Sequence, residues 1–283
     1  MTPARRPPER RRDQANGPRR RQPAGSTGSG SLGGEQIEGR NAVRELLFAE
    51  RRRTYELWLQ EGLDHAPVLD EIAELAREAR VPVRRVGAYQ LDDVAKSQVH
   101  QGVVALAESL EAVSLDDLVE KRTPAPFLLV LDGVTDPHNL GAVLRSALGA
   151  GVSGVVLPKH RSAHVTAAVA KAAAGAIEYL DIAVVAGIPS ALDRLARLKI
   201  WSVGLAADGD TDIDLVQVLT EPVALVLGAE GQGLSSLTRA RCDVLARITL
   251  DGPVESLNVA AAGAVACFAV SRARRNAGAP AGS

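Results

Sequence analysis

An α/β fold in two domains is predicted by three observations on the sequence. The chain has 283 residues, of which 46% are hydrophobic and 24% charged, and this is enough to bury a substantial core. Short apolar runs alternate with segments of helical periodicity along most of its length. The runs 127–131, 152–157 and 223–227 are apolar at nearly every position, which is typical of parallel strands covered by helices on both faces.

The first domain is expected over residues 36–108. Asn41 is interpreted as the N-cap of its first helix, because an Asn side chain accepts hydrogen bonds from the free N–H groups at a helix start. The alternation of strands and helices predicts a small three-layer α/β domain. The expected strands are 55–59, 81–86 and 102–107, and the expected helices are 39–50, 66–80 and 90–95.

The second domain is expected over residues 125–276, after an acidic linker at 109–124. Its apolar strands alternate with helices, which predicts a parallel sheet that is buried on both faces. The expected strands are 127–131, 152–157, 179–185, 200–205, 223–227 and 244–250, and the expected helices are 139–150, 164–174, 189–198 and 256–272.

Positive charge is concentrated near the N-terminus. Residues 1–35 hold eight Arg and three acidic residues, a net charge of +5 in a chain whose formal charge is −1. They contain almost no apolar side chains, so residues 1–35 are expected to be disordered, as are residues 277–283. A basic tail on an acidic body favours binding to a polyanion such as RNA, and a solubilising tail is the alternative. Arg51, Arg52 and Arg53 are the other electrostatic candidates for RNA contact.

Several classes of protein are excluded by the composition. No apolar run is long enough and free enough of charge to span a membrane. The Arg-rich N-terminus lacks the apolar segment of a secretory signal, so a cytoplasmic protein without a membrane partner is expected. The two cysteines, Cys242 and Cys267, form neither a metal-binding pair nor a disulfide framework, and core packing is the favoured role for both.

Three loops that follow expected strands carry residues unusual for plain connections. They are 132–141 (DGVTDPHNLG), 228–235 (GAEGQGLS) and 251–258 (DGPVESLN). Ligands of open α/β sheets bind beyond the carboxyl ends of the strands, so these loops are the candidate site. Asn139 and Arg145 flank the start of one expected helix. Ser256 and Asn258 open another, with Ser256 as a natural N-cap, and free N–H groups there favour a polar ligand.

Other chemistries lack their sequence motifs. The chain has no P-loop and no G-x-S-x-G, and its glycine-rich loop does not have the spacing of a dinucleotide-binding fingerprint. Metal ligation by Asp132, Asp136 and His138 is conceivable, but turn formation is the favoured interpretation. His160 and His164 lack the glutamate of H-E-x-x-H, so no metal site is expected.

The three loops together resemble the motifs of the SpoU (TrmH-like) family of RNA ribose 2′-O-methyltransferases. Motif one is DGVTDPHNLGAVLRSA (132–147), motif two is LVLGAEGQGLS (225–235) and motif three is ITLDGPVESLNVAAAG (248–263). This catalytic resemblance covers residues 125–275. GRNAV (39–43) and HQGVVA (100–105) are similar to the substrate-binding domain of the RlmB-like branch, which methylates a guanosine ribose of 23S rRNA.

The resemblance implies a trefoil-knotted, parallel-sheet methyltransferase domain of the SPOUT type with a small N-terminal α/β substrate-binding domain. It also implies that the protein binds S-adenosylmethionine, methylates a ribose 2′-hydroxyl of RNA and forms a homodimer through the knot region. By motif position, Gly228, Ile248 and Leu257 would line the cofactor pocket. The catalytic residues implied in the same way are Asn139, Arg145, Glu230, Ser256 and Asn258.

Arg145 is expected to act as a clamp rather than as a base. A guanidinium is essentially never deprotonated in proteins, but it holds a phosphate and stabilises a developing alkoxide. Asn139 would orient Arg145 or the ribose. Glu230, Ser256 and Asn258 would order the loops and position the acceptor.

Two positions depart from the family pattern. Thr249 stands where Pro is usual and Ala260 where Ser is frequent, and neither change removes an implied catalytic group. Two alternative functions stay open at this point. One is the same reaction on tRNA, and the other is a non-catalytic RNA-binding or ribosome-assembly protein on the same scaffold. The intact set of five polar residues argues against the second.

Overall fold

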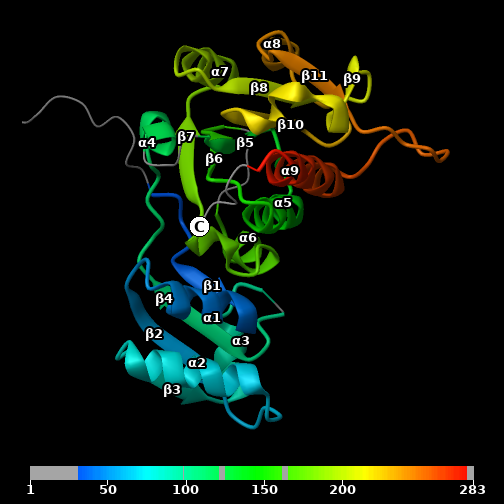
Figure 1. Cartoon of the computed structure of the whole chain (residues 1–283). Helices are drawn as coiled ribbons and strands as arrows, with labels where there is room; N and C mark the ends of the chain where they lie inside the picture. The colour runs from blue at the N-terminus through cyan, green and yellow to red at the C-terminus, as the bar shows by residue number, and fades with distance from the viewer. Residues whose placement is uncertain (1–30, 98, 121–124, 161–164, 279–283) are drawn as a thin grey trace, which may run out of the picture.

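The computed structural model describes residues 31–97, 99–120, 125–160 and 165–278. They form two α/β domains, with the N-terminal domain at the bottom of Figure 1 and the larger domain above it. Residues 1–30 and 279–283 of the predicted tails, 1–35 and 277–283, lie outside the described residues, as does His164. No described helix is long and apolar enough to cross a membrane.

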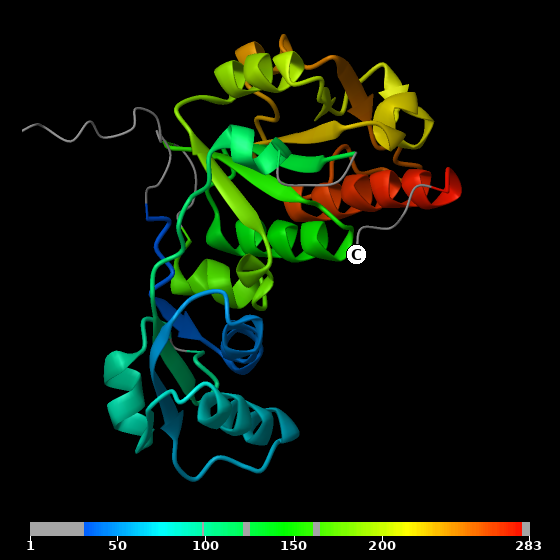
Figure 2. The same cartoon turned by 60° about the vertical axis from the view of Figure 1, so that its left-hand side comes forward.

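The N-terminal domain has the three layers that its sequence predicts. Its sheet has the order β1-β4-β2-β3, in which β4 is antiparallel to β1 and β2, and β3 is parallel to β2. Helices α1 and α2 cover one face, and α3 covers the other (Figure 2). The strands are β1 (Gln36–Glu38), β2 (Thr54–Gln60), β3 (Val83–Val86) and β4 (Val103–Ala107), and the helices are α1 (Arg40–Ala49), α2 (Pro67–Glu78) and α3 (Ala88–Val94).

The larger domain is built on a seven-stranded sheet of order β7-β6-β5-β10-β8-β11-β9, in which every neighbouring pair is parallel. This confirms the predicted parallel sheet. The strands are β5 (Phe127–Asp132), β6 (Gly154–Pro158), β7 (Asp181–Val185), β8 (Trp201–Leu205), β9 (Thr211–Asp212), β10 (Val223–Gly228) and β11 (Val244–Arg247).

Helices cover both faces of the parallel sheet, as the apolar strands require. Side chains of α4 and α7 pack with Leu128 and Val130 on one face, and α5, α6 and α9 pack with Leu129 and Leu131 on the other. Because successive residues of β5 point to opposite faces, one strand serves two separate cores. The helices are α4 (Leu115–Glu120), α5 (Pro137–Gly149), α6 (Ala167–Ala172), α7 (Ile188–Arg197), α8 (Ser236–Arg239) and α9 (Val259–Asn276).

The structure differs from the predictions at the N-terminal boundary of each domain. Residues 31–35 were expected in the disordered tail, but Leu32 and Gly33 exchange backbone hydrogen bonds with Leu110. Strand β1 was not predicted, because three residues are too few to show a periodicity. Helix α4 lies inside the segment that was expected to be a linker.

Two helix starts also differ from the predictions. The N-cap of α1 is Gly39, at φ 95°, and Asn41 lies inside the helix. Helix α9 begins at Val259 with Asn258 as its N-cap, so Ser256 belongs to the preceding loop. An N-cap needs a non-helical backbone conformation one residue before the first helical turn, and sequence spacing alone does not fix that residue.

The order of strands changes direction between β5 and β10. From β5 the chain continues to β6 and β7 on one side, and β10 and β8 lie on the other. The ends of the two central strands are in register, with Gly228 opposite Asp132. Such a switch point opens a crevice beyond the carboxyl ends of the strands. The first and second candidate loops begin there.

Candidate active site

Three polar side chains from the three motif loops form a hydrogen-bonded ring. Asn139 Nδ2 donates to Glu230 Oε2 at 2.9 Å. Asn258 Nδ2 donates to Asn139 Oδ1 at 3.0 Å and to Glu230 Oε1 at 3.2 Å. Both oxygens of the carboxylate are therefore engaged by the two amides. The structure thus brings together three of the five residues that sequence reasoning selected as catalytic.

The helix caps present the two amides to the ring. Asp136 caps α5 by accepting hydrogen bonds from the N–H groups of His138 and Asn139, and Pro137 occupies the first helical turn. Asn258 caps α9 through its Oδ1, which accepts from the N–H of Ala260 at 2.8 Å. The cap uses the acceptor end of the Asn258 amide and leaves the donor end for Asn139 and Glu230. Asp136 has the capping role that the turn interpretation favoured over metal ligation.

Gly228 allows the second motif loop to fold back on its own strand. An ideal Cβ at this position would lie 2.0 Å from the backbone carbon of Gly233, so no other residue fits without moving the loop. Ala229 and Gly233 exchange two backbone hydrogen bonds that close the loop, and Gly231 and Gly233 have positive φ angles. This tight turn holds Glu230 at the crevice.

Two further contacts hold the motif loops, and sequence reasoning did not single them out. Asp132 Oδ2 accepts from the N–H of Ser235 at 3.0 Å, which ties the first loop to the second. Asp212 Oδ2 accepts from the N–H of Thr249 at 3.2 Å and from its hydroxyl. The Thr249 hydroxyl holds the pKa of the Asp212 carboxyl below its usual value. Thr249, at the position where the family usually has Pro, anchors the third loop through this contact.

Arg145 and Ser256 stay outside the ring. Arg145 is exposed on α5, six residues after Asn139, which is about 9 Å farther along the helix. It makes no hydrogen bond or ion pair with another described residue. Ser256 is exposed in the loop before α9. The Arg145 guanidinium therefore has all of its donors available for an anionic ligand.

The residues selected for the cofactor pocket lie around the same loops. Gly228 is buried at the end of β10, and the half-buried Ile248 and Leu257 lie just before the third loop and within it. An ideal Cβ at Gly231, Gly233 or Gly252 would meet nothing within 4 Å. Half-buried apolar side chains beside open, glycine-rich backbone fit a nucleoside whose polar edge is read by main-chain groups.

The two sequence motifs of the first domain meet in the structure. The N–H of Arg40 donates to Gln101 Oε1 at 3.0 Å. His100 Nδ1 accepts from the N–H of Gly102 at 3.1 Å, so its proton is on Nε2, which faces Asp92 Oδ1 at 2.8 Å. The segments 39–43 and 100–105 are thus parts of one local structure.

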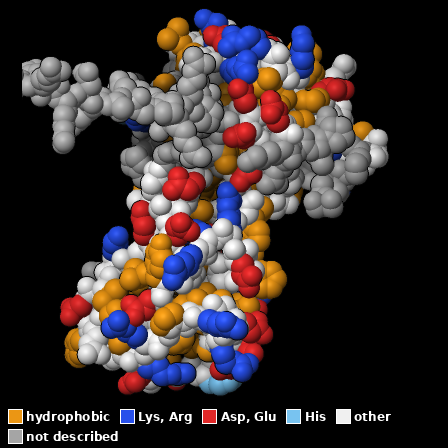
Figure 3. All heavy atoms as spheres, turned by 90° about the vertical axis from the view of Figure 1, so that its left-hand side faces the viewer, with side chains coloured by type: hydrophobic (Ala, Val, Ile, Leu, Met, Phe, Trp, Pro, Cys, Tyr) orange, Lys and Arg blue, Asp and Glu red, His pale blue; other side chains and the backbone are white. Residues whose placement is uncertain are grey.

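The expectation that Arg51, Arg52 and Arg53 are electrostatic candidates for RNA contact is wrong for Arg52. Arg52 is buried and paired with Glu178, and Arg51 is bound to Leu180 and Asp181. Arg51 is exposed in spite of these bonds, and Arg53 is exposed with its guanidinium stacked on Tyr55. On the face shown in Figure 3, acidic and basic side chains alternate over this domain.

The cysteines have the packing role that the sequence favoured. Cys267 is fully buried in α9 and Cys242 is half-buried, and burial raises the pKa of each thiol to about 12. Both are therefore protonated at neutral pH and poor nucleophiles. Within the described residues, no group of His, Cys, Asp and Glu side chains is arranged to hold a metal ion.

Comparison with known proteins identifies the class that this fold and site define. Residues 126–268 match the model of the SpoU rRNA Methylase family. Residues 36–113 match the model of the RNA 2′-O ribose methyltransferase substrate-binding domain. These matches define the chain as an RNA ribose 2′-O-methyltransferase. The chain belongs to the SpoU rRNA methylase family.

Curated relatives support this assignment over most of the chain, and a solved structure shares the fold. The 23S rRNA (guanosine-2′-O-)-methyltransferase RlmB of Pseudomonas aeruginosa is 43% identical over 244 residues, covering 85% of this chain and 97% of that protein. RlmB of Pectobacterium atrosepticum is 43% identical, with 85% and 98% covered. The SpoU methyltransferase AviRb of Streptomyces viridochromogenes, crystallised with AdoMet, has the same fold. It has a TM-score of 0.71 at 23% identity, with 85% of this chain and 90% of that chain covered.

Proposed function

We propose that this protein transfers a methyl group from S-adenosylmethionine to the ribose 2′-oxygen of a guanosine in 23S rRNA. The observation that carries the proposal is the ring of Asn139, Glu230 and Asn258, which joins all three motif loops at the switch point of the sheet. The named activity of the RlmB relatives, similar over 85% of this chain, supports the choice of substrate. Such a substrate would place the enzyme in the cytoplasm.

The reaction needs positioning more than activation. S-adenosylmethionine supplies a sulfonium methyl group that is already reactive toward a ribose oxygen, so alignment contributes much of the acceleration. Glu230 accepts from two amides, and it therefore orders the loops rather than taking the hydroxyl proton. Arg145, with its donors uncommitted, would clamp a substrate phosphate and stabilise the developing alkoxide. Ser256, exposed beside the ring, would position the acceptor.

We propose that the protein acts as a homodimer through the knot region of the larger domain. Ala261, Val265, Phe268 and Arg272 lie on one exposed stripe of α9, and Val265 and Phe268 are each 38% exposed. Phe268 lies beside the exposed C-terminal end of α5, near Gly149. This stripe, apolar from Ala261 to Phe268, is the surface that we assign to the partner protomer. The trefoil knot implied by the family would be formed by the loops around the ring.

The experiment that tests the proposed function measures methyl transfer from labelled S-adenosylmethionine. Unmodified 23S rRNA and total tRNA are offered separately to the wild-type protein. We expect label in 23S rRNA, in alkali-resistant dinucleotides that report 2′-O-methylation. Label in tRNA alone would support ribose 2′-O-methylation as the reaction but would contradict 23S rRNA as the substrate. Absence of both transfer and cofactor binding would favour a non-catalytic RNA-binding protein.

A further inference from the structure

Arg52 is a buried cation that joins the two domains. It lies between α1 and β2 of the first domain, and its side chain is 4% exposed. Its Nε and Nη2 donate to Oε2 and Oε1 of Glu178 at 3.0 and 2.7 Å. Glu178 belongs to a 3₁₀ turn (Ala176–Glu178) of the larger domain, and its side chain is 1% exposed. The two charges form a bidentate ion pair that water does not reach.

The remaining nitrogen of the Arg52 guanidinium binds the two chain segments that flank the first domain. Nη1 donates to the carbonyl oxygen of Gly34 at 2.6 Å and to that of Glu108. Gly34 precedes β1, and Glu108 follows β4. One side chain therefore ties together the α1–β2 turn, both segments that flank the first domain and the larger domain.

Other polar contacts surround this pair. Arg51 donates to the carbonyl oxygen of Leu180 and to Asp181 Oδ1, both at 2.7 Å. The hydroxyl of Tyr179 donates to Glu45 Oε2 at 2.6 Å. Burial and the Glu45 carboxylate raise the pKa of Tyr179 to about 12, which keeps this donor protonated. All of these bonds run from the region of α1 to the segment around the 3₁₀ turn.

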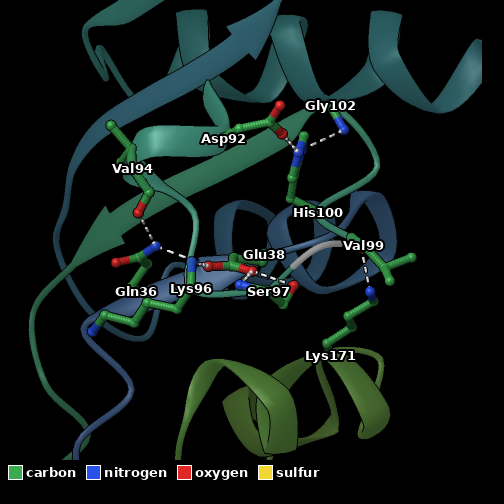
Figure 4. A network of polar contacts seen from close by, with 10 residues as sticks. All are labelled: Gln36, Glu38, Asp92, Val94, Lys96, Ser97, Val99, His100, Gly102 and Lys171. Carbon is green, nitrogen blue, oxygen red and sulfur yellow. Dashed lines mark hydrogen bonds and ion pairs between the residues drawn. The ribbon is translucent and has the colours of Figure 1, made fainter. Parts of the chain in front are cut away.

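The domains also share one packed core. An ideal Cβ at Gly175 would lie 2.2 Å from the Cβ of Glu45, so α1 rests directly on the backbone of the larger domain. Figure 4 shows a further link, in which Lys171 of α6 reaches the carbonyl oxygen of Val99. Apolar side chains from both domains belong to a single cluster, among them Val43, Leu46, Leu47, Val169, Ala173 and Ile177. The first domain is therefore docked on the second and not merely tethered to it.

A buried ion pair in such an interface fixes how one domain is placed on the other, and it contributes less to the free energy of folding. Replacing both partners of a buried pair with apolar residues is often neutral or stabilising, because the desolvation cost disappears. The pair nevertheless requires one arrangement, since a bidentate contact fails when the partners shift or rotate. Apolar packing alone would tolerate sliding of one domain over the other.

We infer that Arg52 is a positioning residue for RNA methylation. Together with Glu178, it sets the first domain at one place relative to the ring of Asn139, Glu230 and Asn258. RNA held by the first domain then reaches the reacting centre at a fixed distance. This inference rests on the proposed function, because it assigns Arg52 a role in the use of an RNA substrate.

The test separates positioning from folding with paired substitutions. Arg52→Met alone leaves Glu178 buried without a partner, whereas Arg52→Met with Glu178→Met removes both charges. We expect the double variant to recover the thermal stability that the single variant loses. The matched control is Arg194→Met, which breaks a bidentate Arg–Asp116 pair of the same geometry that is half exposed and lies away from the interface between domains.

Kinetics with 23S rRNA give the first readout. For the double variant we expect unchanged affinity for S-adenosylmethionine and a kcat within about threefold of the wild type. We expect its KM for RNA to rise at least about tenfold, because RNA is presented to the site over a range of positions. Arg52→Lys, which keeps the charge and can reach Glu178, should recover part of this loss. A normal KM for RNA in a stable double variant would overturn the inference. A loss of S-adenosylmethionine affinity as large as the rise in the KM for RNA would also overturn it.

A distance measurement without RNA gives the second readout. Spin labels are placed at Glu61→Cys and Arg197→Cys, one exposed site in each domain, in a Cys242→Ser background. The labelled chain is diluted with unlabelled protein so that distances within one chain dominate. We expect a narrow distribution in the parent and in Arg194→Met and a broad one in the double variant. An equally narrow distribution in the double variant would contradict the inference, whether or not the parent methylates RNA.

Discussion

Asn258 Nδ2 donates a hydrogen bond to Asn139 Oδ1 across 119 residues of sequence, at 3.0 Å. The same amide caps α9 through its oxygen, so one side chain both starts a helix and links two motif loops. Glu230 closes the ring from the second motif loop. The site is thus assembled by mutual contacts among loops and not by a single element.

Asn258→Ser should separate the capping role from the ring. Serine is also a strong N-cap, so we expect the melting temperature to stay close to that of the wild type. It has no amide to reach Asn139 and Glu230, and we expect kcat to fall by about 10- to 100-fold. Thermal melts and single-turnover methyl transfer check both parts. Asn258→Ala should lose about 1 kcal/mol of stability as well. A normal kcat in Asn258→Ser would show that the hydrogen bonds of the ring are not needed for methyl transfer.

Arg145→Ala should abolish most activity without changing stability. The Arg145 side chain contacts no other described residue through a hydrogen bond or ion pair, so its loss leaves the fold intact. We expect kcat/KM to fall by about 100- to 1,000-fold, because a charged donor to the transition state is lost. Arg145→Lys should not restore the rate, since an ammonium lacks the bidentate fork. Arg197→Ala, an exposed arginine on α7, is the matched control and should be normal.

Gly228→Ala should disable the second motif loop. The added methyl group would lie within about 2.0 Å of the Gly233 backbone, so the turn that holds Glu230 must open. We expect S-adenosylmethionine affinity, measured by calorimetry, to fall at least about tenfold, together with a lower melting temperature. Gly252→Ala, where an ideal Cβ meets nothing within 4 Å, is the control. Equal affinities in the two variants would show that the loop conformation does not shape the cofactor pocket.

Phe268→Asp should shift the protein from dimer to monomer. A carboxylate on the apolar stripe of α9 must be desolvated in the interface and is destabilising there. Light scattering should give a mass near twice the chain mass of 29.7 kDa for the wild type and near that of one chain for the variant. Leu237→Asp, on α8 and 68% exposed, should not change the mass. A monomeric wild type would contradict the assignment of this surface.

Much of the site was predictable because its residues lie in polar loops that directly follow apolar strands. Asn139, Glu230 and Asn258 each follow an apolar strand, and parallel strands bring such loops to one edge of a sheet. The assignment of N-caps failed at Asn41 and at Ser256, since capping depends on the backbone conformation of one residue. The contact of Asp132 with Ser235 was missed because a turn-forming Asp has the same sequence context in any loop.

The interface between the domains could not be predicted from the sequence. Arg52 stands between two other arginines, and such a run is usually a solvated or polyanion-binding surface. Its partner Glu178 lies 126 residues away, in a short turn that has no sequence signature. Strand β1 and helix α4 were missed for a similar reason, because each is too short to establish a periodicity.

We propose that the ring of Asn139, Glu230 and Asn258, together with Arg145, directs methyl transfer to one ribose of 23S rRNA. The most direct measurement is mass-spectrometric mapping of 2′-O-methylated nucleotides in unmodified 23S rRNA after incubation with the protein and S-adenosylmethionine. We expect one methylated guanosine, which is absent with Arg145→Ala or Asn139→Ala and present with Arg197→Ala. Methylation of a base, or of the same ribose by all three variants, would contradict it.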